Sequence, residues 1–434
     1  MKLSYYNKLF FILGILAFAN SCLPYYVQTQ SPENELNNVA AIYNPTINSL
    51  HPSYHIFRRD EKTSIIVAKV YKSEILINDA NTDKINRGKV QFALNLYKIE
   101  NDTRTLVDTL RFSYDVELKP YENVFIAQMT INTEPGVTYS LHIIYNDLLK
   151  QKFTVSYIDI ENAQKNTGQN YLVSLNHTSV PAFKTYFADN EYFKITENFL
   201  QDSILYVEYF DYTYPLPRPP ASITQPELVS PKPDTVYLLN ARANSLLMQQ
   251  TKGMYRYTKD TATHNGLTLF TFQNKYYPRV KTSQDMLQPI RYLVSEQEFG
   301  KLSNVTNTKY ALDKFWLSLA LGDKEKAREL IKIFYTRVVL ANNYFTSYTE
   351  GWRTDRGMIY IIYGPPKVIQ KNHLKEKWIY GNTQSAETLA FTFYKRDHQF
   401  STNHFELLRN NIYSASWRNA VKSWRAGNPF YGGN

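Results

Sequence analysis

One stretch of the chain, GWRTDRGMIYIIYGPP at residues 351–366, places more local demands on the backbone than any other. Its glycines, Gly351, Gly357 and Gly364, permit left-handed backbone conformations that other residues rarely adopt. The apolar run from Met358 to Tyr363 predicts a buried strand, which Pro365 and Pro366 end. We therefore expect a sharp corner that joins a preceding helix to a set of short strands.

Helical signals lie before this corner. Ser295 and Glu298 form a capping-box pattern, which predicts a short helix that ends near Leu302. A second helix, expected to stop at Gly322, has an apolar face made of Leu312, Phe315, Trp316, Leu319 and Ala320. Asp323 is placed to cap a long third helix with an apolar stripe of Ala327, Leu330, Ile331, Phe334, Val338, Ala341 and Phe345. Such stripes are typical of helices that pack into a core.

Strand signals follow the corner. The segments Glu376–Tyr380, Thr388–Tyr394 and Phe405–Leu408 are expected to pair with Met358–Tyr363. A final helix has one apolar face that consists of Trp417, Ala420, Val421 and Trp424. Residues 290–434 are therefore predicted to form a domain that mixes helices with antiparallel strands.

The region before these helices is predicted to be β structure. The chain has 36 Tyr and 24 Phe but 15 Gly, a composition that favours strands with aromatic faces. In residues 54–160 apolar and polar residues alternate over segments at regular spacing: Ser64–Tyr71, Lys89–Ile99, Thr105–Val116, Asn123–Ile131, Val137–Tyr145 and Lys152–Ile158. About seven antiparallel strands in about a hundred residues predict an immunoglobulin-like β-sandwich without a cysteine pair.

Residues 165–288 are predicted to form a second immunoglobulin-like β-sandwich domain, less regular than the first. Its strand candidates are Tyr171–Leu175, Ile204–Phe210, Thr235–Leu239, Gly253–Tyr257 and Gly266–Phe272. Between them the proline-rich run Tyr214–Pro220 cannot pair as a central strand, so we interpret it as a rigid extended loop. At 434 residues the chain is long enough for several such domains.

The amino terminus indicates export and lipidation. Lys2 and Lys8 precede an apolar run of ten residues, Leu9–Phe18, which is typical of a signal peptide at residues 1–21 and too short for a membrane span. Cys22, the single cysteine of the chain, follows Ala19-Asn20-Ser21, the position where a lipoprotein signal peptidase cuts. We predict that Cys22 is acylated, for example with palmitate, and that residues 22–53 form a polar tether.

The net charge limits the partners. Cleavage would remove Lys2 and Lys8, so the net charge of +10 would fall by two, to +8. On a membrane-anchored chain this excess favours anionic lipid headgroups or acidic protein partners. Basic residues do not cluster in a nucleic-acid-binding motif, so we expect no nucleic acid partner. The expected location is the outer membrane, on either its periplasmic or its cell-surface face.

These motifs together resemble a known family. Phe315-Trp316, the long helix, GWRTDRG at 351–357 and Tyr363-Gly364-Pro365-Pro366 are similar to the GWxTD domain, as are the later segments Lys377–Tyr380 and Phe391–Tyr394. The resemblance covers roughly Leu293 to Leu408. It implies a lipoprotein of the Bacteroidetes type, in which β domains precede the GWxTD domain. The family supplies no catalytic residue that could be carried over to this chain.

The polar residues of the motif allow two interpretations. Asp355 could act as an acid or base while Arg356 binds an anion and Trp352 stacks on a ligand. Alternatively, Thr354 or Asp355 bonds to the backbone of a turn, Arg356 pairs with a carboxylate and Trp352 fills the junction. We favour the second interpretation, because glycines around a tryptophan and a Thr-Asp pair suit a sharp turn.

Signatures of catalysis and of cofactor binding are weak. His373, His398 and His404 have no spacing typical of a metal site, and the chain has no second thiol to help bind zinc. The nucleotide-binding glycine motifs and the Gly-x-Ser-x-Gly elbow do not occur. We therefore expect no catalytic residues, no metal and no cofactor.

Three functions are compatible with this sequence. The favoured one is a non-enzymatic envelope lipoprotein that acts as a scaffold or docking subunit of an outer-membrane assembly for secretion, import or barrel assembly. The first alternative is a glycan-binding surface lipoprotein, suggested by the aromatic content. The second is an envelope hydrolase that uses Glu350 and Asp355 with His373.

Overall fold

The computed structural model describes residues 38–78, 87–101, 103–163, 167–175, 178, 180–197, 204–224, 229–240, 246–381 and 388–431. The predicted signal peptide and Cys22 lie outside these residues. In the part of the chain that is described, no helix is both long and apolar enough to span a bilayer.

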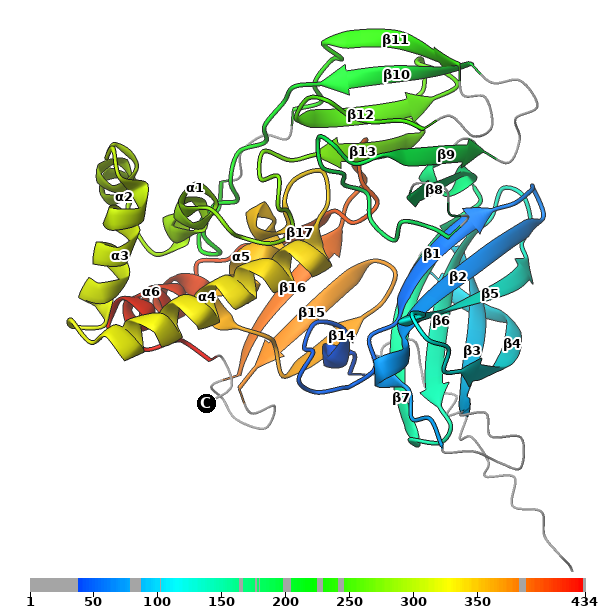
Figure 1. Cartoon of the computed structure of the whole chain (residues 1–434), viewed down its shortest axis with the longest axis horizontal. Helices are drawn as coiled ribbons and strands as arrows, with labels where there is room; N and C mark the ends of the chain where they lie inside the picture. The colour runs from blue at the N-terminus through cyan, green and yellow to red at the C-terminus, as the bar shows by residue number, and fades with distance from the viewer. Residues whose placement is uncertain are drawn as a thin grey trace, which may run out of the picture. The chain divides into compact units, whose positions relative to one another are not determined.

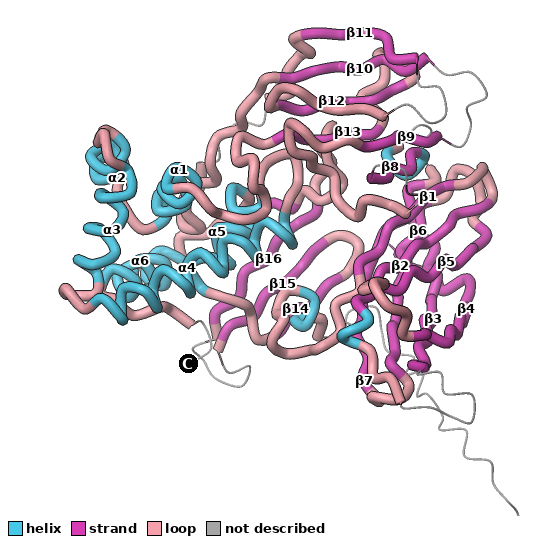
Figure 2. The backbone as a smooth tube through the Cα atoms, in the orientation of Figure 1, coloured by secondary structure: helices cyan, strands magenta, loops and turns pink. Residues whose placement is uncertain are grey.

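The first region consists of two antiparallel sheets (Figures 1 and 2). One sheet has the order β1-β2-β5, with β1 Ser53–Arg58, β2 Thr63–Tyr71 and β5 Val124–Asn132. The other has the order β4-β3-β6-β7, with β3 Arg87–Glu100, β4 Thr103–Glu117, β6 Thr138–Asp147 and β7 Lys152–Glu161. One apolar core joins the sheets, since it includes Ile66 and Met129 from the first and Phe92 and Leu141 from the second. A short 3-10 helix, η2 Lys72–Glu74, follows β2.

The second region is also antiparallel β structure. A four-stranded sheet has the order β11-β10-β12-β13, with β10 Ile204–Phe210, β11 Thr235–Asn240, β12 Gly253–Thr258 and β13 Leu267–Thr271. The short 3-10 helix η3 Gly168–Asn170 leads into a two-stranded sheet of β8 Tyr171–Leu175 and β9 Phe193–Glu197. The strands predicted here are confirmed within one or two residues at each end, whereas β9 has no counterpart in the prediction. Residues 211–219, which include most of the proline-rich run, have no regular secondary structure, as predicted.

The carboxyl-terminal region mixes helices with strands (Figure 2). Its helices before the motif are α1 Ser283–Leu287, η4 Gln288–Tyr292, α2 Glu296–Ser303, α3 Thr308–Leu319 and α4 Lys324–Phe345. After the motif comes the antiparallel sheet β14-β15-β16-β17, with β14 Val368–Lys371, β15 Lys375–Tyr380, β16 Leu389–Lys395 and β17 Phe405–Leu407, and then α6 Tyr413–Arg425. The predicted caps are confirmed: Ser295 and Glu298 form a capping box, and the Asp323 carboxylate accepts from the first amides of α4.

The apolar run Met358–Tyr363 is a helix, so the predicted strand is wrong. It belongs to α5 Asp355–Tyr363, whose amino-terminal cap is Thr354 and whose carboxyl-terminal cap is Gly364. All nine residues of α5 are buried. A helix that is surrounded on every side carries no 3.6-residue alternation, and its isoleucines and tyrosines then resemble a buried strand. The four strands of the sheet therefore pair with one another, and α5 packs on them through the rings of Tyr360 against Trp378 and of Tyr363 against Phe391.

Part of the segment predicted as a tether is packed into the fold. Residues 38–53 lie within the range 22–53, yet Val39, Ala40, Tyr43 and Leu50 are buried. Val39, Ala40 and Tyr43 belong to the core of the carboxyl-terminal region. Ala40 starts the 3-10 helix η1 Ala40–Ile42, and Val39 and Tyr43 flank it, while Leu50 belongs to the core of the first region. These residues are therefore packed parts of the fold.

Candidate functional site

The first two glycines of the motif permit a close approach between backbones. Gly351 opens the 3-10 helix η5 Gly351–Arg353, and a Cβ atom placed on it would lie 2.1 Å from the carbonyl oxygen of Ala341 in α4. A Cβ atom on Gly357 would lie 2.0 Å from the carbonyl oxygen of Gly351. Neither glycine has a positive φ, so the predicted left-handed backbone is wrong at these two positions. Glycine is required there because α4, η5 and α5 touch through their backbones.

The third glycine does adopt the left-handed conformation. Gly364 has a φ of 80° and ends α5 just before Pro365, as a carboxyl-terminal cap should. The buried side chain of Arg337, which comes from α4, lies against it and donates to the carbonyl oxygens of Ile361 at 3.0 Å and Ile362 at 3.2 Å. A cation thus satisfies the last carbonyl groups of α5.

Trp352 is a core residue. Its side chain is 5% exposed and its ring meets that of Tyr292 edge-on at 6.0 Å. Its backbone amide donates to the side-chain oxygen of Asn342 at 3.0 Å, and its indole nitrogen donates to Glu350 at 3.1 Å. Burial raises the pKa of Glu350, against the opposing effects of Arg353 and of that indole bond. Trp352 therefore fills the helix junction, and no open aromatic face remains for stacking a ligand.

Thr354 and Asp355 hold the start of α5. The Thr354 hydroxyl accepts from the amide of Gly357 at 3.0 Å and donates to the carbonyl oxygen of Gly351 at 2.8 Å. The buried Asp355 carboxylate accepts from the amide of Leu407 in β17 at 2.8 Å and from Nη1 of Arg409 at 3.0 Å. Burial raises the pKa of Asp355, while Arg409 and the Leu407 amide act in the opposite direction. The carboxylate joins the helix to the sheet.

Arg356 belongs to a buried ionic cluster. Its Nη1 donates to Glu376 in β15 at 3.2 Å, and its Nη2 donates to the carbonyl oxygen of Asn403 at 3.0 Å. Glu376 is 0% exposed and also accepts from Lys371 at 2.9 Å and from the Tyr43 hydroxyl at 2.8 Å. Burial alone would raise the pKa of Glu376, but the charges of Lys371 and Arg356 and these hydrogen bonds lower it to about 2. The carboxylate is thus ionised at neutral pH.

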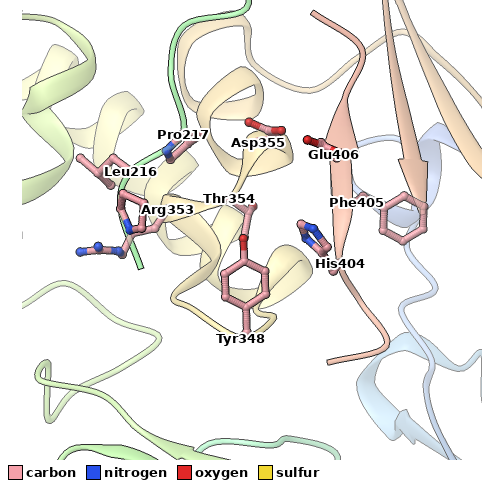
Figure 3. A pocket seen from close by; sticks show the side chains of 10 residues that line it. Leu216, Pro217, Tyr348, Arg353, Thr354, Asp355, His404, Phe405 and Glu406 are labelled. Carbon is pink, nitrogen blue, oxygen red and sulfur yellow. The ribbon is translucent and has the colours of Figure 1, made fainter. Parts of the chain in front are cut away.

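A small pocket lies beside the motif (Figure 3). It has a volume of about 50 Å³, room for a water molecule or two, between the segment carrying Leu216 and Pro217 and the strand carrying Glu406. Asp355 and His404 also line it. Burial lowers the pKa of His404 to about 4, so the imidazole is neutral at pH 7. The pocket is too small for a substrate larger than a few atoms.

The predicted hydrolase residues do not share this pocket. Asp355 lines it, but Glu350 and His373 do not. His373 lines a separate cleft of about 880 Å³, together with His398 and with residues of both β regions. Within the described residues, His, Cys, Asp and Glu side chains form no group of three that could hold a metal ion.

Several residues of this site escape sequence reasoning, and two of them carry a local signal. Asn342 stands between Ala341 and Phe345 on the buried stripe of α4, where a polar side chain needs a partner. Glu376 lies two residues before the buried Trp378 in the same strand, so both side chains are expected on the face that packs into the core. Tyr43 carries no such signal, because its partner Glu376 lies 333 residues away.

Comparison with known proteins agrees with this geometry. The model of the GWxTD domain family matches residues 253–426. The match begins in β12, ahead of the predicted start at residue 290, and includes the motif, the four-stranded sheet and α6. No curated protein matches the chain. Residues 253–426 of this chain are therefore a GWxTD domain.

Proposed function

We propose that this chain is a non-enzymatic scaffold or docking lipoprotein of the bacterial cell envelope. One observation carries the proposal: the polar side chains that a catalytic reading of the motif would need are engaged inside the fold. Asp355 is held by Arg409 and Leu407, and Arg356 by Glu376 and Asn403. Groups that are fixed in this way position secondary structure, and they offer little to a substrate.

Links between the regions support a scaffold role. Lys395 of β16 pairs with Asp159 of β7 at 2.6 Å, which joins the GWxTD domain to the first β region. Nη2 of Arg409 donates to the carbonyl oxygen of Arg218 in the proline-rich run at 2.8 Å. Because Arg409 also holds Asp355, one guanidinium ties the motif to this run. Such links suit a protein that presents several surfaces at fixed spacing.

The remaining features of the proposal come from the sequence and from the sheet arrangement. The lipid anchor at Cys22 and the Bacteroidetes-type origin rest on the signal-peptide pattern and on the resemblance. Seven antiparallel strands around one core support immunoglobulin-like docking modules in the first region. The expected location is the outer membrane, with protein partners in an envelope assembly.

The proposal is tested by affinity purification of the tagged full chain from native membranes. We expect specific outer-membrane proteins to co-purify with the wild type and the chain to fractionate with membranes. Cys22→Ala should release the chain from membranes or leave an uncleaved precursor. A chain that purifies alone after gentle solubilisation contradicts the docking role, and unchanged lipid labelling of Cys22→Ala contradicts the anchor.

A second candidate function is binding of a neutral glycan in the cleft of about 880 Å³. The rings of Tyr54, Tyr186 and Tyr344 and the amides of Asn265 and Asn343 line this cleft, and such groups suit sugars. Titration calorimetry with neutral oligosaccharides tests this function, with Tyr186→Ala as the variant. Saturable binding that Tyr186→Ala weakens supports glycan recognition, and the absence of heat for every oligosaccharide removes its basis.

A further inference from the structure

Residues 38–43 lie against the edge of the GWxTD sheet: Asn38 and Val39 pair with β14, and the single 3-10 turn η1 then leads to Tyr43. The amide of Val39 donates to the carbonyl oxygen of Ile369 in β14 at 2.9 Å. The amide of Ile369 donates in return to the side chain of Asn38 at 3.0 Å, and Asn38 pairs with Gln370 as an isolated bridge. Asn38 and Val39 thus pair with the edge of β14 through one backbone hydrogen bond and one side-chain hydrogen bond, as a peptide ligand can add to a sheet edge.

At the end of this segment Tyr43 enters an aromatic socket. We define the socket by Tyr344, Phe345, Tyr360 and Trp378, which come from α4, α5 and β15. The ring of Tyr43 lies 4.9 Å from that of Phe345, 5.5 Å from that of Tyr344 and 5.7 Å from that of Trp378. The hydroxyl of Tyr360 donates to the Tyr43 carbonyl oxygen at 2.7 Å. Tyr43 is 5% exposed.

The floor of the socket recognises the tyrosine hydroxyl. This hydroxyl donates to Oε1 of Glu376 at 2.8 Å and lies 3.4 Å from Nη1 of Arg356, which donates to it. Both members of the Arg356–Glu376 ion pair thus bond to the Tyr43 hydroxyl, one as donor and the other as acceptor. A phenylalanine would fill the same volume but would remove one donor from a fully buried carboxylate.

The chain leaves the socket at an exposed turn. Pro45, Thr46 and Ile47 follow directly and are exposed. The side chain of Asn44 holds this turn by accepting from the amide of Thr46 at 3.1 Å. The segment is therefore a short ligand, bounded by an exposed connection on its carboxyl-terminal side.

We propose that the socket is a peptide-binding site of the GWxTD domain for a short segment that ends in a tyrosine, filled here by residues 38–43 of the same chain. The motif arginine then has a ligand-recognition role as well as a structural one. One consequence rests on the proposed anchor: Cys22 precedes Asn38 by 38 − 22 = 16 residues, which reach at most about 55 Å. Tension on the tether would then act on Tyr43 and the motif before it reaches the β regions.

A cut in the connection tests the proposal on the full chain. A recognition sequence for a site-specific protease is inserted between Thr46 and Ile47, and the detergent-solubilised protein carries a carboxyl-terminal tag. After cleavage and capture on the tag, we expect the amino-terminal fragment to stay bound. In Tyr43→Ala the fragment should be lost, whereas Tyr121→Ala, at a fully exposed tyrosine of another region, should retain it as the wild type does. Loss of the wild-type fragment overturns the proposal, as does full retention by Tyr43→Ala.

Peptide exchange keeps the test decisive if Tyr43→Ala does not fold. A fluorescent synthetic peptide of residues 38–46 should enter the cut wild-type protein and displace the native fragment. The same peptide with Tyr43→Phe should bind at least about tenfold more weakly, because it lacks a hydrogen bond to a buried charge. Equal binding of the two peptides refutes recognition of the hydroxyl. Repeating the capture with Cys22→Ala separates the socket from the proposed lipid anchor, because loss of the anchor should leave retention of the fragment unchanged.

Discussion

The glycine at the start of the motif gives a quantitative test of the packing. In Gly351→Ala the new Cβ atom would lie 2.1 Å from the carbonyl oxygen of Ala341 and 2.7 Å from the Cα atom of Asn342. Both are backbone atoms of α4, so no side chain can rotate to make room. To reach an ordinary contact of 3.4 Å, η5 and the carboxyl-terminal part of α4 would have to move apart by 3.4 − 2.1, about 1.3 Å.

Overpacking of this kind usually costs 1–3 kcal/mol and sometimes more. Alanine also stabilises the protein by less than about 1 kcal/mol, because it lowers the conformational entropy of the unfolded chain. We therefore expect Gly351→Ala to lower the free energy of unfolding by about 2 kcal/mol, which is the upper end of the overpacking cost less the gain from the unfolded chain. Gly357→Ala should have a similar effect, because its Cβ would lie 2.0 Å from another carbonyl oxygen.

Gly300→Ala is the matched control. Gly300 lies in α2, and a Cβ atom there has no neighbouring atom within 4 Å. Alanine favours a helix over glycine by about 0.5–1 kcal/mol, so this variant should be more stable than the wild type. The two substitutions are chemically identical and should shift stability in opposite directions.

Tryptophan fluorescence is the suitable assay, since all five tryptophans lie between residues 316 and 424. Urea titration followed by this signal reports unfolding of the part of the GWxTD domain that contains these tryptophans. If the free energy of unfolding of Gly351→Ala lies within about 0.5 kcal/mol of the wild-type value, the close backbone contact is not a feature of the folded protein. Our explanation of the glycines then fails.

Three further predictions concern buried polar groups and the motif tryptophan. The pKa of Glu376, lowered from 4.5 to about 2, contributes stability that is complete above pH 4.5 and is lost as the pH falls through 2, about 3 kcal/mol in all. Glu376→Gln should flatten acid unfolding in that window, and an unchanged pH profile argues against the ionic cluster. Arg409→Ala should cost about 3–5 kcal/mol by leaving Asp355 buried without its cation, whereas Arg396→Ala, at an exposed pair with Glu406, should change urea stability by less than about 1 kcal/mol. Trp352→Ala should lower the free energy of unfolding by about 3–5 kcal/mol in the same titration. A loss under about 1 kcal/mol would show that the ring is exposed and could bind a ligand.

The sequence predicts those helices and strands that have one buried face and one solvent-exposed face. The strands of the β regions alternate because one side meets the core and the other meets water, and the stripe on α4 has the same origin. α5 has no wet face, so its period is hidden. Its ends nevertheless carry helix signals, namely Thr354 as a cap before Asp355 and Gly364-Pro365 as a stop, and these signals are more specific than the apolar run.

The site was predictable as a turn, but its partners were not. The preferred interpretation of Trp352 and Arg356 as structural residues agrees with their burial and their bonds. Their partners are Tyr43, Asn342 and Glu376. Tyr43 lies 313 residues from Arg356 and carries no local signal, whereas the patterns around Asn342 and Glu376 indicate buried polar groups but not the group that each one bonds. The glycines illustrate the same limit, because a close approach between backbones leaves no trace in a local pattern.

A double-mutant cycle between Tyr43 and Glu376 tests the central claim most directly, namely that the GWxTD motif builds a socket for the amino-terminal segment. The free energy of unfolding is measured by tryptophan fluorescence for the wild type, Tyr43→Phe, Glu376→Gln and the double variant. We predict a coupling energy of at least about 1 kcal/mol, because Tyr43→Phe removes the buried hydrogen bond of 2.8 Å and Glu376→Gln removes the charge that strengthens the same bond. Additive effects, within about 0.3–0.5 kcal/mol, would contradict the claim.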